Sequence, residues 1–372
     1  MKLRDFKLEV FFDKYEFRAP FLLAQSDCET MSIQELLSFS ADTDEFLATP
    51  LGYTEVAGST ELRSLIASLF NNMSEEHILT HSGAEEAIFS FMNVFLNKDD
   101  HIITMSPAYQ SLYEIALCMG CEVSNWELYP NDEKWSADFT ELKKMIRPNT
   151  KLIVINSPHN PTGYTFSEKE VIELCEIADR NNIFVFADEV YRGLSIDGAK
   201  HPWFADIYDR SISLGVMSKS YGLAGLRIGW VASHDKNILE DMRKFKTYLS
   251  ICNSAPSEAL AKIALKNSDK ILKRNNEIIQ KNLEISDMFF EKYSNFFTYY
   301  RPQSGPVAFH RLNADESIDT FCEKLVTKSG VLLLPASVYE YDAPHFRMGY
   351  GRRNFSDNLN KFEEYLIEAK YV

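Results

Sequence analysis

The chain has 372 residues, 39 of them basic and 54 acidic, and its net charge of −15 disfavours nucleic acid or an acidic membrane as a partner, because both bind basic patches. No apolar run approaches the roughly 20 residues of a membrane span, and the charged N-terminus lacks a hydrophobic signal region. Six cysteines without a signal peptide are typical of reduced thiols, so we expect a cytoplasmic protein.

Short apolar runs rich in β-branched residues alternate with helix-like segments in the middle of the chain. Strands are predicted at residues 101–105, 151–156, 183–188, 211–217 and 228–233. The segment 167–182 has helical spacing, with Ser167 as N-cap and Glu170 completing a capping box. Strands that are apolar on both faces favour a mixed, mostly parallel sheet flanked by helices, which is an α/β fold.

The closest pair of cysteines is Cys118 and Cys121. A redox or zinc pair is one interpretation, but no second pair completes a metal site. We favour a helix that ends at Gly120 and leads into a strand, and we predict no metal.

The character of the sequence changes at about Ser257. A charged, helix-forming stretch runs to about Lys292, and candidate strands at 306–312 and 330–337 precede a closing helix at 357–370. We therefore predict a large domain at 46–256 and a smaller α+β domain made of 1–45 and 257–372.

Polar side chains follow three of the predicted strands. Asn160 lies in a Pro/Asn/Gly turn after the strand 151–156, Asp188 ends the strand 183–188, and Lys219 follows the strand 211–217. In parallel α/β sheets, ligands bind beyond these carboxyl ends of the strands. An unpaired carboxylate at Asp188 needs a cationic partner, which a protonated ring nitrogen of a cofactor would supply, although a helix N-cap is an alternative.

Lys219 is expected to be an amine nucleophile. Partial burial and cationic neighbours lower the pKa of a lysine and make it available for a Schiff base. Nearby, Arg227 offers a bidentate fork and Ser218 a hydroxyl for a phosphate.

Upstream, the stretch "ILTHSGAEEAIFSFM" predicts a strand, a glycine turn and the start of a helix. Backbone N–H groups at Gly83, Ala84 and Glu85 would form an anion site there, although a plain strand-to-helix turn is the alternative. With an aromatic ring at Tyr109, these parts are the ones that pyridoxal 5′-phosphate requires of a protein.

At this point the chain resembles the class I/II aminotransferases, which are fold type I enzymes dependent on pyridoxal phosphate. The resemblance runs from about Leu51 to the C-terminus. It is carried, in family order, by "YTEVAGSTELRSLIA", "SGAEEAI", "PAYQSLY", "NPTG", "ADEVY", "SKSYGLAGLRIGW" and "FRMGYGR".

The resemblance implies a role for each residue around the cofactor ring. Lys219 would form the internal aldimine and later move the substrate Cα proton. Asp188 would pair with the pyridinium nitrogen, Asn160 and Tyr191 would bind the phenolic oxygen, and Tyr109 would stack on the ring.

The resemblance also implies groups for the phosphate, the substrate and a second subunit. The phosphate would be held by Gly83, Ala84, Glu85, Ser218 and Arg227. Arg347 would bind the α-carboxylate of the substrate, with Asn160 beside it. Tyr53 would reach the phosphate of the neighbouring subunit, which implies a homodimer with shared sites.

The chain departs from the family pattern at three places. Val216 stands where a small hydroxyl residue or glycine is usual, and Glu85 where Ser, Thr or Gln is usual. Because a carboxylate would repel phosphate, we expect Glu85 to contact phosphate through its backbone, with its side chain turned away. The stretch "LLAQSDCETMSIQELL" lacks the glycine-rich loop near the substrate side chain. Arg352 and Arg353 could contact an acidic side chain, or could form a solvated charge pair.

The leading hypothesis is an aminotransferase that moves an α-amino group between an amino acid and a 2-oxo acid by way of Lys219. A lyase, a cyclase or another enzyme that deprotonates Cα without transamination would use the same parts. A non-catalytic effector-sensing domain and a Rossmann dehydrogenase are disfavoured, the latter because no G-x-G-x-x-G follows an early strand.

Overall fold

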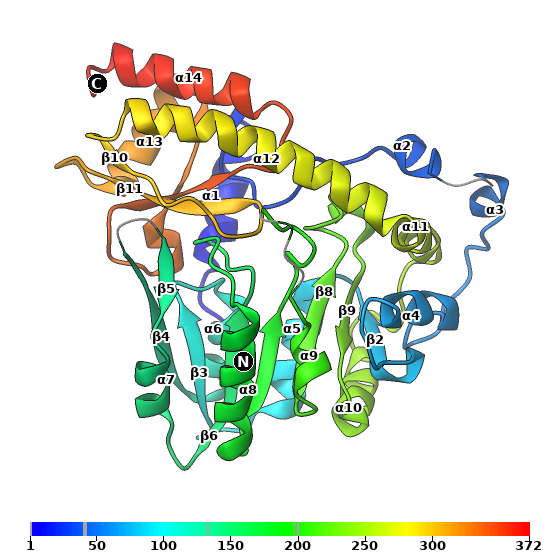
Figure 1. The fold of residues 1–372 in the computed structure, drawn as a ribbon. Coiled ribbons are helices and arrows are strands. Elements are labelled where there is room, and N and C mark those ends of the chain that lie inside the picture. Colours follow the sequence, from blue (N-terminus) through cyan, green and yellow to red (C-terminus); the bar gives the residue numbers. More distant parts are fainter. Residues whose placement is uncertain (1, 40–42, 132–133, 197, 199–200) are drawn as a thin grey trace.

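A computed structural model describes residues 2–39, 43–131, 134–196, 198 and 201–372. Its centre is an eight-stranded sheet in the order β2-β9-β8-β7-β6-β3-β4-β5 (Figure 1). The strands are β2 (Ile78–His81), β3 (His101–Ser106), β4 (Glu122–Pro130), β5 (Trp135–Ala137), β6 (Thr150–Asn156), β7 (Phe184–Asp188), β8 (Ser211–Val216) and β9 (Gly229–Ala232).

The central strands β4, β3, β6, β7 and β8 run parallel, as the apolar runs predicted. β9 runs antiparallel to both β8 and β2, and β5 runs antiparallel to β4. The sheet is therefore mixed and mostly parallel. Its carboxyl edge collects the ends of β6, β7 and β8, which carry three of the predicted polar side chains.

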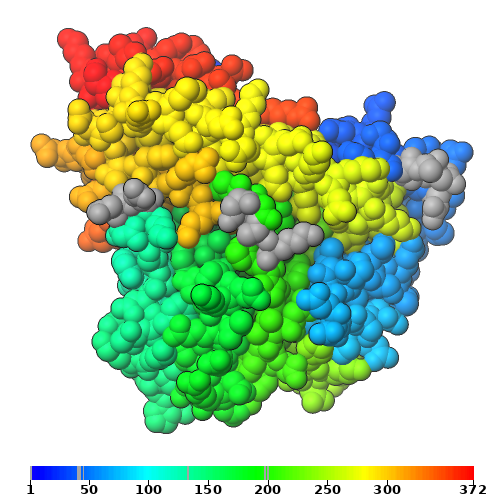
Figure 2. Space-filling view, viewed as in Figure 1, coloured from blue at the N-terminus to red at the C-terminus, as the bar shows by residue number. Residues whose placement is uncertain are grey.

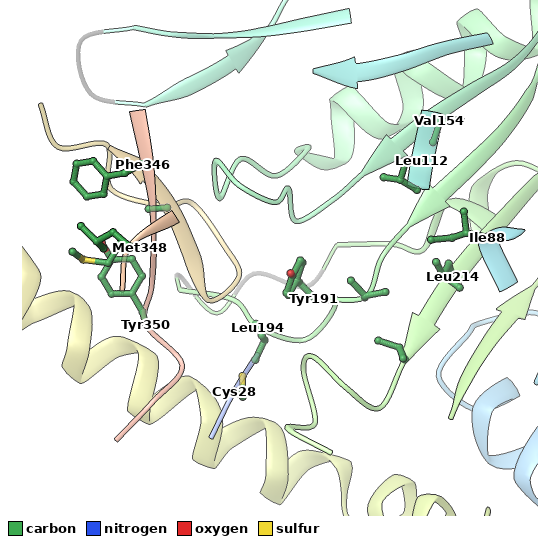
Figure 3. Packing of buried hydrophobic residues seen from close by; sticks show 14 of the residues in the cluster. Cys28, Ile88, Leu112, Val154, Tyr191, Leu194, Leu214, Phe346, Met348 and Tyr350 are labelled. Atoms are coloured by element: carbon green, nitrogen blue, oxygen red, sulfur yellow. The ribbon is translucent and has the colours of Figure 1, made fainter. Parts of the chain in front are cut away.

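Both faces of the sheet are buried, because alternate residues along each strand enter different cores. On β6, Val154 packs in one hydrophobic cluster and Ile153 in another. Phe186 and Val185 divide in the same way on β7. Figure 3 shows part of the first cluster, with Val154, Leu112 and Leu214 near the sheet and Met348 in the smaller sheet.

Helices cover both faces of the large sheet, and their ends follow local sequence signals. In α8, the Ser167 hydroxyl accepts from the Glu170 N–H while the Glu170 carboxylate accepts from the Ser167 N–H, so the predicted capping box forms. Gly120 ends α6 with φ of 89°, and all six cysteines are free thiols. The helices of this region are α4 (Thr60–Ala67), η1 (Glu75–His77), α5 (Ala84–Phe95), α6 (Ser111–Met119), α7 (Phe139–Met145), α8 (Glu168–Arg180), α9 (Phe204–Ile207), η2 (Ala224–Leu226) and α10 (Lys236–Lys246).

A smaller antiparallel sheet, in the order β10-β11-β14-β13, lies above the large one in Figure 1, under the helices of the C-terminal region. The predicted helical stretch divides at Asn267 into two helices. The elements are α11 (Ala255–Lys266), α12 (Ser268–Lys292), β10 (Phe297–Thr298), β11 (Val307–Leu312), α13 (Ile318–Ser329), β12 (Val331–Leu332), β13 (Leu334–Pro335), η3 (Ala336–Tyr339), β14 (His345–Gly349) and α14 (Phe355–Glu368).

The N-terminal segment joins these parts. Its elements are α1 (Lys7–Tyr15), β1 (Phe21–Leu22), α2 (Ile33–Leu37) and α3 (Thr43–Leu47). β1 pairs in parallel with β12, and α1 packs on η3 where the smaller sheet meets the large one (Figure 1). The limits of the two predicted domains, at 45/46 and 256/257, stay a prediction. Within the described residues, no helix combines the length and apolarity needed to cross a bilayer.

Candidate active site

A cavity of about 480 Å³ lies at the carboxyl ends of β6, β7 and β8, beside the start of α5. Ten of the predicted site residues line it, namely Ala84, Glu85, Tyr109, Asn160, Asp188, Tyr191, Ser218, Lys219, Arg227 and Arg347. A larger groove of about 1310 Å³ runs beside α12, and none of the predicted site residues lines it. In Figure 2 the surface of the C-terminal region, yellow to red, lies directly above the cyan and green surface of the region that contains the large sheet.

Lys219 follows β8 and faces this cavity. Burial lowers the pKa of its ammonium group, and Arg347 adds to the lowering, whereas Asp27 opposes it. Nζ donates a hydrogen bond to the Ser26 hydroxyl at 2.9 Å. A lysine in such surroundings has a larger neutral fraction, and the neutral amine is the form that attacks a carbonyl carbon.

Asp188 places a buried carboxyl at the end of β7. Burial raises its pKa to about 7, and Oδ1 accepts a hydrogen bond from the Val190 N–H at 3.2 Å. Residues 190–193 form a turn, so the N-cap alternative is wrong because no helix begins there. Among the described side chains, no Lys or Arg forms an ion pair with Asp188, and a protonated ring nitrogen fits this unpaired group.

The glycine turn before α5 and Arg227 together form an anion cradle. Gly83 has φ of 94°, and a Cβ there would lie 2.6 Å from Nη2 of Arg227, so only glycine lets the guanidinium approach. Within the described residues, Arg227 bonds only the Ala224 carbonyl, at 3.2 Å. Its remaining donors and the α5 N-terminus therefore suit a phosphate. Ser218, beside Lys219, lines the same cavity.

Arg347 and Asn160 form one buried network with two groups that the sequence did not indicate. Nη1 of Arg347 donates to Asn160 Oδ1 at 3.0 Å and to the Tyr339 hydroxyl at 2.6 Å, and Nη2 donates to the Ala24 carbonyl at 2.6 Å. Tyr339 also donates to Asn160 Oδ1, at 2.9 Å. Oδ1 of Asn160 already accepts two hydrogen bonds, so the part of this side chain left for a ligand is the Nδ2 amide group, which donates.

The family model of the aminotransferases of class I and II matches residues 41–359. This chain belongs to that family. A PLP-dependent aminotransferase from Streptococcus suis 89-1591 shares 30% identity over 99% of both chains, with a TM-score of 0.93. Capreomycidine synthase from Streptomyces vinaceus is 26% identical over 79% of this chain and 75% of its own. The PLP-dependent cyclase OrfR has the same fold, with a TM-score of 0.92 and 20% identity. The match covers 99% of this chain and 98% of OrfR.

The aminotransferase family depends on pyridoxal 5′-phosphate, and the donor set of this chain suits that cofactor. Asp188 and Arg227, neither of which forms an ion pair with another described residue, and Lys219, whose pKa is lowered, lie around one cavity. In the described part of the chain, no group of His, Cys, Asp and Glu side chains could hold a metal ion.

Two predicted residues lie away from the cavity lining. Gly83 lies next to the Arg227 guanidinium, whereas Tyr53 is 91% exposed and does not line the cavity. Tyr109, by contrast, lines the cavity with its ring centroid 4.8 Å from that of Phe6. The exposure of Tyr53 leaves it accessible to another molecule.

Sequence reasoning missed Ser26, Tyr339 and Asn156. The Asn156 amide donates to the Asp188 carbonyl at 2.9 Å and accepts from the Asn160 N–H at 2.7 Å, so it ties two cavity loops together. Its place as the last residue of an apolar strand was the available signal. Arg352 is not a solvated charge, because it bonds Asp27 at 2.8 Å and 2.9 Å.

Proposed function

We propose that the protein transfers an α-amino group between an amino acid and a 2-oxo acid, both bound in the cavity at Lys219. The observation that carries this proposal is the meeting of a lysine amine, an unpaired carboxyl at Asp188 and the anion cradle of Arg227 around one cavity of about 480 Å³. Pyridoxal phosphate, when bound, supplies the electron sink that makes the substrate Cα–H acidic.

The side chains of this chain then have distinct tasks. Arg227, Ser218 and the N–H groups at the start of α5 bind the phosphate. Asp188 stays ionised against a protonated ring nitrogen, because the positive charge offsets the effect of burial. Lys219 would accept the proton from the substrate Cα at Nζ and hold it there for return to the substrate or the cofactor, since a lowered pKa leaves more of the amine neutral and able to accept a proton.

The substrate carboxylate is assigned to Arg347. Nη2 of Arg347 has one N–H that donates to no described group, and the Nδ2 amide group of Asn160 is also available as a donor. These donors lie in the cavity that Lys219 also lines. The network through Tyr339 and the Ala24 carbonyl holds the guanidinium in one orientation before substrate binds.

A second function is a cyclase or another enzyme that deprotonates Cα without transamination. The names of two relatives, a synthase and a cyclase, favour it. Both functions use the same Lys219 amine, so the product distinguishes them.

The purified holoenzyme should convert an amino acid into the corresponding 2-oxo acid only when a second 2-oxo acid is present to accept the amino group. We expect one 2-oxo acid formed per acceptor consumed, measured by chromatography, and ping-pong kinetics. Substrate consumption that is independent of any acceptor would replace this proposal with the cyclase or lyase function, and release of ammonia would identify the lyase.

We also propose a homodimer in which Tyr53 binds the cofactor phosphate of the neighbouring subunit. Tyr53 lies in a segment fixed to the loop after α10, where the Thr54 hydroxyl donates to the Asn253 carbonyl at 3.0 Å. That loop exposes Tyr248 and Ile251, and Leu51 is exposed beside Tyr53. Exposed apolar side chains gathered in this way are typical of a protein interface.

Sedimentation should give twice the mass of the chain, and Tyr53→Phe should weaken cofactor binding roughly tenfold through loss of a hydrogen bond to a charged group. The dissociation constant is measured by the absorbance of the bound cofactor. Tyr129→Phe removes a hydroxyl from another exposed tyrosine and should leave binding unchanged. A monomer, or equal affinities in all three proteins, contradicts the shared site. The cytoplasmic location stays a prediction.

A further inference from the structure

Helix α1 forms one wall of the cavity, and the segment that begins it is held by hydrogen bonds to residues in and just before α6. Five residues of this segment line the cavity, namely Phe6, Leu8, Glu9, Phe12 and Glu16. Arg4 donates from Nε to both oxygens of the Glu114 carboxylate, at 3.0 Å and 2.8 Å. The Lys7 N–H donates to the Gln110 side chain at 3.0 Å. The side chains of α1 are therefore held at defined positions over the cavity.

Some charged side chains of the cavity form an ion pair or are assigned to the cofactor or the substrate carboxylate, and others are not. Arg227, Arg347, Lys219 and Asp188 are taken up by the cofactor and the substrate carboxylate under the proposed function. Asp27 forms an ion pair with Arg352 at 2.8 Å. Three carboxylates remain that form no ion pair with a described Lys, Arg or His, namely Glu9, Glu16 and Glu85. Lys219 attracts Glu9 and Arg227 attracts Glu85, but under the proposed function the cofactor takes up both cations.

Two of these carboxylates lie close enough to repel each other. Burial raises the pKa of Glu85 to about 7, and repulsion from Glu9 and Asp188 adds to this, whereas the Ser111 hydrogen bond and Arg227 oppose it. The Glu9 carboxylate accepts a hydrogen bond from the Tyr109 hydroxyl at 3.1 Å, and the Glu85 carboxylate accepts one from the Ser111 hydroxyl at 3.2 Å. Neither is paired with a described Lys, Arg or His, so a bound cation would relieve the repulsion.

A buried amide in the same cavity also lacks a partner. Gln25 is 5% exposed and lines the cavity, yet neither its Nε2 nor its Oε1 forms a hydrogen bond within the described structure. An unsatisfied buried polar group carries a free-energy penalty of about 1–3 kcal/mol. A polar ligand group that bonds this amide would remove the penalty, which is an observation independent of the carboxylates.

We propose that the substrate is an amino acid with a cationic side chain, a guanidinium or an ammonium group, which Glu9 and Glu85 bind beneath α1. This inference rests on the proposed function, because it assumes that the α-carboxylate lies at Arg347 and the amine at Lys219. An acidic side chain would meet three carboxylates instead. The two arginines that follow β14, Arg352 and Arg353, do not line the cavity.

The test compares each cationic amino acid with a neutral amino acid of nearly the same shape. L-arginine is paired with L-citrulline, and L-lysine with L-norleucine, and kcat/KM is measured with the holoenzyme. We expect a preference of at least about tenfold for one of the cationic amino acids, chiefly in KM. The pair with the larger ratio identifies the head group as guanidinium or ammonium.

The variants separate the charge of Glu9 from its other contacts. Glu9→Gln should lower kcat/KM for the preferred cationic substrate about tenfold and leave the neutral partner within about threefold. Glu85→Gln should act in the same direction. Asp13→Asn also removes an acid from α1, but Asp13 does not line the cavity, so this control should match the wild type.

Each result counts for or against the inference. If neutral or acidic amino acids react as well as the cationic ones, or if Glu9→Gln lowers both members of a pair equally, the inference is wrong and the proposed function stands. If no amino acid changes the absorbance of the bound cofactor, the proposed function itself fails, and this inference fails with it.

Discussion

Replacing Lys219 with alanine is expected to lower kcat by about 10⁴-fold. Among the described residues that line the cavity, Lys219 is the one lysine, and it combines a lowered pKa with a place at the end of β8. Its loss removes the group that transfers the Cα proton, which is typically a contribution of 10²–10⁴, as well as the nucleophilic amine. Single-turnover absorbance changes after mixing with substrate measure the effect on the chemical step.

The variant should still bind the cofactor phosphate, because Arg227 and the turn at Gly83 are intact. Lys236→Ala is a matched control, since Lys236 is exposed, forms an ion pair with Glu76 at 2.6 Å and does not line the cavity. It should have the wild-type kcat. Turnover of the Lys219 variant near the wild-type rate would show that another group moves the proton.

Replacing Asp188 with asparagine is expected to lower kcat by about 10²–10³-fold, because a neutral amide no longer stabilises a positive charge on the ring nitrogen. The protein should keep its cofactor, since the phosphate cradle is separate from β7. The steady-state kcat of the reconstituted variant measures this loss. A rate close to that of the wild type would mean that Asp188 does not contact the ring nitrogen.

The same substitution should stabilise the apoprotein, and the effect should grow with pH. Burial raises the pKa of Asp188 to about 7 in the folded chain, above the roughly 3.9 of an unfolded aspartate. Between these values the folded state binds more protons, so the wild-type apoprotein loses stability as the pH rises from about 4 to 7.

Asparagine has no such proton equilibrium, and we expect the variant to gain roughly 2–4 kcal/mol in the free energy of unfolding at pH 8 and little at pH 4. Denaturant unfolding of the apoproteins at both pH values measures the difference. Asp179→Asn, an exposed position on α8, is the control and should show no pH-dependent gain. An equal effect at pH 4 and pH 8 would contradict the assigned cause.

Much of the candidate site could be predicted because its residues follow buried strands directly. Asn160, Asp188 and Lys219 come after β6, β7 and β8, and strands that are apolar on both faces predict a parallel sheet. Parallel neighbours bring their carboxyl ends to one edge, so local sequence placed these side chains together. The capping box at Ser167 and the left-handed Gly120 are also local signals, and both formed as predicted.

Contacts between distant segments required the tertiary structure. Ser26 bonds Lys219 and Ala24 bonds Arg347 across 193 and 323 residues, and neither contact leaves a periodic trace in the sequence. The direction of β9 was likewise undetermined, because an apolar run fits either orientation. Only folding showed that Glu9 on α1 faces Tyr109 and the cavity.

The sequence by itself thus determined the parallel centre of the sheet, the polar residues at the ends of its strands and the cofactor chemistry, because these depend on local apolar patterns and short motifs. The tertiary structure decided which charges remain unpaired around the substrate. Pairing depends on which side chains from remote segments meet, as Asp27 meets Arg352 while Glu9 forms no ion pair in the described chain. The substrate specificity that we propose therefore depends on contacts that exist only in the folded cavity.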